Sequence, residues 1–191
     1  EMDEETYLKH LQNNTLPEIL NHEKVKPGDV FFLPAGRVHA LGAGILLAEI
    51  QQTSDLTYRI FDWNRVGADG KPRELHTDLA LEAMDFKYYG QYRTGYELKR
   101  NEGSNLVRCD YFTTNLLEID KPRQRDLIEL DSFVAYMCMD GRVELIYDER
   151  ESIHLEKGES LLVPASIEHL AYKPEPYAKL LEVYVEGKKQ E

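Results

Sequence analysis

The chain has 191 residues, 42% of them hydrophobic, and 23 basic against 35 acidic side chains give it a net charge of −12. This length is enough to bury a proper hydrophobic core in one large or two small domains. The negative balance argues against broad binding to nucleic acid or to anionic membranes, because both need a positive surface. No apolar run approaches the roughly 20 residues that cross a bilayer, and residues 1–5 do not resemble a signal peptide, so we expect a cytoplasmic protein. Cys109 and Cys138 are too few for a disulfide framework and are expected to be reduced.

The first half of the chain begins with helical signals and then changes to β signals. Residues 3–13 predict a helix with acids in its first turn, and residues 16–20 predict a further turn. Thr77 and Asp78 suit the start of a second helix through Met84. Short β runs are expected between these helices, at 30–33, 38–41, 45–51 and 57–63. We therefore expect a helical accessory segment at 1–24 and part of a β-barrel at 25–90.

The second half predicts a further set of short strands. A tyrosine-rich connection, residues 91–105, leads into a second barrel at 106–191. Asp140-Gly141 has the composition of a two-residue hairpin turn. Evenly spaced short strands are typical of a sandwich or a closed barrel. The strands are expected at 107–119, 132–139, 142–147, 160–163 and 178–185.

Two segments 130 residues apart share one pattern, residues 28–39 and 158–169. Each has a glycine, an acid, four strand-type residues, Pro-Ala, and a histidine five residues after the proline. So many matched positions at one offset indicate a duplicated β unit. The first copy, Gly-x5-Pro-x-Gly-x2-His, resembles the second sequence motif of the cupins. That resemblance implies two small β-barrels, with His39 facing the interior of the first as a metal ligand.

A longer stretch narrows the resemblance. Residues 27–42 and 49–59 are similar to the type I mannose-6-phosphate isomerases, in particular their short bacterial branch, with support from 61–65 and 75–77. The resemblance implies a mainly β fold, a tandem cupin of jelly-roll barrels with a few accessory helices, of which the first barrel is incomplete here. It also implies interconversion of mannose 6-phosphate and fructose 6-phosphate through a cis-enediolate, on a zinc ion in the first barrel.

The resemblance assigns roles to particular side chains. Arg59 matches the arginine regarded as catalytic, and a fixed guanidinium suits a developing oxyanion. Arg59 alternatively pairs with Glu49, Asp55 or Asp62 as a purely structural residue. Glu49 or Asp55 is a candidate to orient Arg59 or to transfer protons, and the sequence does not choose between them. For Asp55, capping of a turn is an equal alternative.

The remaining metal ligands of the family have no counterpart in this chain. A glutamine, a histidine and a glutamate of the family lie upstream of the segment that matches residue 1. We therefore expect the C-terminal portion of a longer protein, inactive alone, with one Zn²⁺ per parent protein and weak or no zinc binding in this chain. The second barrel is expected to be metal-free, because Gly36 is replaced by Ser166 and residues 133–139 contain no histidine or carboxylate. His169 is then expected to face the barrel interior without companions.

Two further functions remain open at this stage. The chain is alternatively another cupin sugar isomerase or epimerase, or a non-catalytic cupin that binds a sugar phosphate or a regulatory partner. The expected partner is in each case a small-molecule sugar phosphate, with no nucleic acid and no membrane. Lys71 and Arg73 in the polar loop 65–73 are candidates to attract the phosphate, although exposed loop charges are more often simply solvated.

Overall fold

A computed structural model describes residues 2–148 and 151–187. The chain divides into two compact units, unit 1 at residues 1–93 and unit 2 at residues 94–191. Within the described ranges, no helix is both long and apolar enough to cross a membrane.

The helices of unit 1 form where the sequence predicts them. α1 spans Glu4–Gln12, and the side chain of Asp3 caps it by accepting a hydrogen bond from the Thr6 amide at 2.8 Å. A short 3-10 helix, η1, spans Leu16–Ile19, and α2 spans Thr77–Ala83. Both predicted helices and the predicted turn are therefore confirmed.

The strands predicted in unit 1 do not form. Across the described residues of this unit no sheet strand occurs at 30–33, 38–41, 45–51 or 57–63, so these predictions are wrong for this structure. An extended segment becomes a strand only when a neighbour satisfies its amide and carbonyl groups. Among the described residues, most of the exposed large apolar side chains belong to this unit, and Leu46 is 98% exposed.

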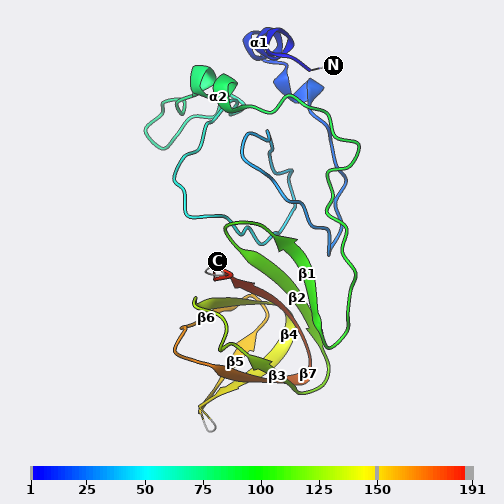
Figure 1. Cartoon of the computed structure of the whole chain (residues 1–191). Helices are drawn as coiled ribbons and strands as arrows, with labels where there is room; N and C mark the ends of the chain where they lie inside the picture. The colour runs from blue at the N-terminus through cyan, green and yellow to red at the C-terminus, as the bar shows by residue number, and fades with distance from the viewer. Residues whose placement is uncertain (1, 149–150, 188–191) are drawn as a thin grey trace. The chain divides into compact units, whose positions relative to one another are not determined.

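Unit 2 is an antiparallel sheet in the order β1-β2-β7-β4-β5, with β3 added to β7 and β6 added to β4 (Figure 1). The mainly β class predicted from the sequence is confirmed. Its strands are β1 Gly103–Arg108, β2 Thr113–Ile119, β3 Arg123–Asp126, β4 Val134–Tyr147, β5 Glu151–Glu156, β6 Ser160–Val163 and β7 His169–Tyr184.

The two longest strands, β4 and β7, pair with each other along most of their length and so connect the whole sheet. The pairing register shifts on both sides of Asp140-Gly141, which makes this dipeptide a bulge inside β4 and not the predicted hairpin turn. Gly141 has a φ of +74°, and a Cβ there would lie 2.1 Å from the carbonyl oxygen of Tyr177. A glycine with positive φ suits a bulge as well as a turn, and close backbone approach selects the bulge here.

Other strand boundaries differ from the sequence pattern in the same unit. The predicted strand 107–119 is two strands, β1 and β2, and the predicted strand 178–185 is the second half of β7. β6 lies where predicted, while β3 and β5 were not predicted at all. The sequence of β3, Arg-Gln-Arg-Asp, contains no apolar residue, so it carries no periodic signal.

The core of unit 2 collects the apolar residues that share the inner face of the bent sheet. In β4 the buried residues change from even numbers, such as Tyr136, to odd numbers, such as Val143, across the bulge. An unbroken period of two does not allow this change, so the bulge keeps both halves of β4 facing the core. The core comprises Leu117, Ile119, Leu127, Val134, Tyr136, Cys138, Val143, Leu145, Leu155, Val163, Leu170, Tyr172, Ala178 and Leu180.

The two copies of the repeated motif have matching local geometry. Gly28 and Gly158 both have positive φ, +93° and +90°. In each copy the acid after the glycine caps the same turn, because Asp29 accepts from the Lys26 amide at 3.0 Å and Glu159 accepts from the Glu156 amide at 2.8 Å.

The second turn of the motif is also shared. The Arg37 amide donates to the Pro34 carbonyl at 3.2 Å, and the Ile167 amide donates to the Pro164 carbonyl at 3.1 Å. The repeated turns thus recur in a unit that forms a sheet and in one that does not, which means that local sequence alone specifies them.

Candidate functional site

Arg59 is fixed by backbone contacts with the segment that precedes α2. Its amide donates to Nδ1 of His76 at 3.1 Å, and its carbonyl accepts from the His76 amide at 2.8 Å. The Arg59 guanidinium donates to the Glu74 carbonyl at 3.3 Å. His76 immediately precedes Thr77 and serves as the N-cap position of α2. His76, 17 residues after Arg59, therefore holds the candidate catalytic arginine in place. The sequence pattern does not indicate this contact.

The structural alternative for Arg59 is an ion pair with a nearby acid, and no such pair occurs among the described residues. One of the candidate acids, Asp62, is 6% exposed and already pairs with two other arginines. Arg73 Nε lies 2.8 Å from Asp62 Oδ2, and Arg65 Nε lies 3.2 Å from Asp62 Oδ1. Arg73 and then Arg65 hold the pKa of the Asp62 carboxyl well below its usual range, although burial opposes them. Arg59 thus retains a half-buried guanidinium without a carboxylate partner in this part of the chain.

The polar loop 65–73 is a closed hairpin and not a solvated charge run. Val66 and Pro72 form an antiparallel bridge, and the Gly67 amide donates to the Lys71 carbonyl at 2.7 Å. Arg73, predicted to attract phosphate or to be solvated, instead binds Asp62. The sequence does not indicate the pairing of Arg73 with Asp62, because nothing in it marks Asp62 as a buried residue.

The other predicted site residues are exposed and take no part in the ion pairs of Asp62. His39 is exposed, and its Nδ1 lies 3.0 Å from the Arg37 carbonyl. Glu49 and Asp55 are also exposed. The turn beside Asp55 is capped by Ser54, whose Oγ accepts from the Leu56 amide at 3.3 Å.

The described residues do not complete a zinc site at His39. Zinc in proteins takes three or four nitrogen, sulfur or oxygen ligands. The one group of three His, Cys, Asp or Glu side chains found close enough to share a metal, in the ranges the structure describes, is Glu144, His154 and Glu175 in unit 2. His39 belongs to no such group among the described residues.

The Glu144, His154 and Glu175 group is better explained by ion pairing. Lys173 Nζ lies 2.8 Å from Glu144, and Arg142 Nε lies 3.1 Å from Glu175. His154 Nε2 itself lies 3.4 Å from Glu175. The cationic side chains already compensate the carboxylates, so the group needs no metal ion.

His169 does not face the barrel interior as predicted. It is exposed at the start of β7, while the next residue, Leu170, is buried in the core. Because side chains alternate along a strand, the two point to opposite faces. The matched histidine of the second copy therefore contacts solvent.

Comparisons with known proteins identify relatives of the chain. The model of the mannose-6-phosphate isomerase cupin domain matches residues 102–174. The mannose-6-phosphate isomerase ManA of Bacillus subtilis (strain 168) is 32% identical over 166 residues, which cover 86% of this chain and 51% of that protein. The chain is therefore similar to mannose-6-phosphate isomerases over most of its length. Its resemblance to the type I members of that family is thereby confirmed.

Two further proteins show the same similarity. A mannose-6-phosphate isomerase of Streptococcus mutans is 30% identical over 78% of this chain and 46% of its own length. The crystal structure of the Bacillus subtilis mannose 6-phosphate isomerase matches 96% of this chain and 57% of that chain, with a TM-score of 0.83 at 26% identity. The cupin fold is therefore confirmed. The chain spans about half the length of the curated relatives that it matches.

Proposed function

We propose that this chain forms part of a longer enzyme that interconverts mannose 6-phosphate and fructose 6-phosphate. The observation that carries the proposal is the similarity to isomerases of that name across most of the chain, together with Arg59, whose guanidinium is held in place but faces no carboxylate among the described residues. The exposed apolar side chains of unit 1, including Leu46, support a longer protein, because additional strands would cover them.

The reaction moves one proton from C2 to C1 and one from O2 to O1. A base removes the C2 proton, the electron pair forms a C1–C2 double bond, and negative charge develops on O1. Proton transfer from O2 to O1 and reprotonation at C1 then give the ketose. We assign Arg59 to stabilise the oxyanion of this cis-enediolate, since a guanidinium keeps its charge throughout.

Glu49 and Asp55 are the candidates for the base. Both are exposed in this structure and neither is engaged by Arg59. Burial by further parts of the enzyme would raise the pKa of either carboxyl toward the range that suits proton transfer. We further propose that the enzyme depends on zinc and that His39 contributes one ligand, while the others come from outside this chain.

Replacement of Arg59 by alanine in the full-length enzyme tests the proposal. We expect kcat to fall by about a hundredfold or more, near 3 kcal/mol of lost transition-state stabilisation, with folding and zinc content nearly unchanged. Arg100→Ala is the matched control, because Arg100 is exposed and pairs with Asp120 in unit 2. Equal kcat values for the two variants would assign Arg59 a structural role and remove the support for this mechanism.

A further inference from the structure

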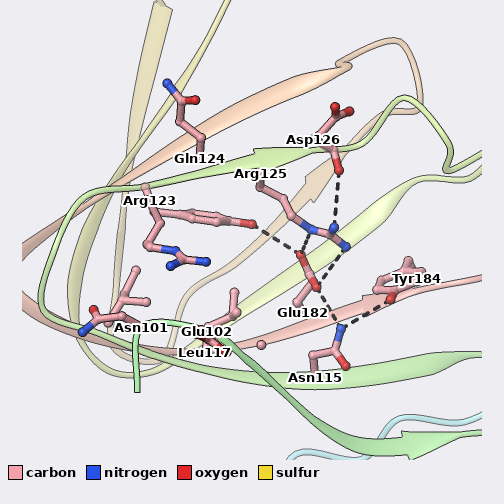
Figure 2. A pocket seen from close by; sticks show the side chains of 13 residues that line it. Asn101, Glu102, Asn115, Leu117, Arg123, Gln124, Arg125, Asp126, Glu182 and Tyr184 are labelled. Carbon is pink, nitrogen blue, oxygen red and sulfur yellow. Dashed lines mark hydrogen bonds and ion pairs between the residues drawn. The ribbon is translucent and has the colours of Figure 1, made fainter. Parts of the chain in front are cut away.

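Unit 2 contains a cavity that the proposed reaction does not use. It has a volume of about 320 Å³ and lies among β2, β3, β7 and the residues that lead into β1 (Figure 2). This volume is near the lower end of the range for small-molecule sites, about 300–1,000 Å³. Most lining residues are polar, and Leu117 and Ile119 are the larger apolar ones.

The floor of the cavity is a charged residue that is itself fully buried. Glu182 is 2% exposed, and Arg125 Nε donates to its Oε1 at 2.9 Å. Tyr136 and Tyr172 donate to the same oxygen at 3.0 and 3.3 Å, and Asn115 donates to Oε2 at 3.0 Å. Both carboxylate oxygens are thus occupied, and the floor is rigid before any ligand arrives.

The charges of this floor balance one another. Burial lowers the pKa of Arg125, but Glu182, together with Tyr172 and Tyr136, raises it above its usual value, so the guanidinium stays charged opposite the carboxylate. Burial and then Glu182 raise the pKa of the Tyr136 hydroxyl, and burial raises that of Tyr172. The two tyrosines therefore remain neutral, and the floor has no charge left for a ligand.

Arg123 is different, because its charge is not compensated. Arg123 and Arg125 alternate with Gln124 along β3, and Figure 2 shows both arginines reaching to the same side of the strand. Arg123 lines the cavity and is exposed, and its guanidinium has no hydrogen bond or ion pair within the described ranges. It is therefore available to bind an anionic group.

Hydroxyl-binding groups lie around the same cavity. Tyr184 lines it, and its hydroxyl accepts from Asn115 at 3.4 Å, which leaves its proton to donate. Glu102 lines it as well, and its carboxylate has no hydrogen bond or ion pair in the part of the chain that is described. A carboxylate beside an anion site repels a second anion but accepts hydrogen bonds from hydroxyl groups.

We propose that this cavity binds a small sugar that carries an anionic substituent, with Arg123 at the anion and Glu102 and Tyr184 at the hydroxyl groups. The site lies wholly within unit 2 and does not share Arg59 or His39. The proposal goes beyond the isomerase reaction and does not depend on it.

Binding to the 191-residue chain with Arg59→Ala tests this site. Mannose 6-phosphate and glucuronate are the two anionic sugars, and mannose and inorganic phosphate are the partial probes, each followed by amide chemical shifts at residues 101–103, 115 and 123. We expect at least one anionic sugar to bind with a dissociation constant of about 1 mM or below, at least tenfold tighter than either partial probe. The better of the two anionic sugars identifies the substituent as phosphate or carboxylate.

Arg123→Gln should weaken that binding by about tenfold or more, as expected for the loss of one charge-assisted hydrogen bond. Arg108→Gln, an exposed arginine of β1 outside the cavity, should leave the binding unchanged. Glu102→Gln provides a second variant, which should weaken both the anionic sugar and mannose. Absence of shifts for both anionic sugars, equal effects of the two arginine variants, or inorganic phosphate binding as tightly as the sugars would overturn the proposal. None of these results bears on the kcat of Arg59→Ala in the full-length enzyme, so the two proposals fail separately.

Discussion

Replacing Glu182 by glutamine should destabilise unit 2 by about 3 kcal/mol. The substitution conserves shape but leaves the partly buried Arg125, 32% exposed, without its counter-charge. Loss of one partner from a buried pair costs about 3–5 kcal/mol, and the solvent contact of Arg125 places the value at the lower end. The new amide also puts N–H donors among the donors of Arg125, Tyr136 and Asn115.

Amide hydrogen exchange of β4 and β7 is the suitable assay, because it reports the opening of unit 2 by itself. Fluorescence of the single tryptophan would not, since Trp63 lies in unit 1. Glu156→Gln is the matched control, because Glu156 is 58% exposed in its contact with Arg142 and should cost below about 1 kcal/mol. A Glu182→Gln loss within about 0.5 kcal/mol of the control would refute the view that this carboxylate anchors β3 to the sheet.

Two further substitution pairs test the bulge and the duplicated motif. Gly141→Ala should lower the free energy of unfolding by at least about 2 kcal/mol more than Gly158→Ala. Both glycines have positive φ, but a Cβ at Gly141 would meet the Tyr177 carbonyl, whereas a Cβ at Gly158 would meet nothing within 4 Å. Equal losses in urea unfolding would show that β4 and β7 separate easily. His39→Ala in the full-length enzyme should abolish zinc binding, while His169→Ala, an exposed residue of unit 2, should leave metal content unchanged. Zinc lost from the His169 variant, or kept in the His39 variant, would mean that the metal lies in the other barrel.

The sequence predicted those features that depend on few neighbouring residues. The helix predicted at residues 3–13 and the repeated motif at 28–39 and 158–169 need only local hydrogen bonds, and α1 and the matching turns at Gly28 and Gly158 are present. Asp140-Gly141 was misread because a hairpin and a bulge both need a glycine with positive φ, and only the approach of Tyr177 distinguishes them.

Features that depend on distant partners could not be predicted in the same way. β3 exists because β7 pairs with it and because Arg125 reaches Glu182, 57 positions away. A charged residue inside the apolar run of residues 180–183 was the available sign that Glu182 is buried with a partner. In unit 1 the β pattern was present without a neighbouring strand, so the pattern alone did not give a sheet.

The arrangement of β7 also has a consequence for synthesis of the protein on the ribosome. β7 is the last strand of unit 2, yet it lies between β2 and β4 and also pairs with β3. Until about residue 184 has emerged, β2 lacks the strand on its inner side and Glu182 is not there to hold Arg125. Unit 2 is therefore expected to stay unfolded, and open to proteases and chaperones, through nearly all of its translation. A premature stop codon anywhere before the second half of β7 should remove the whole unit and not only its final strand.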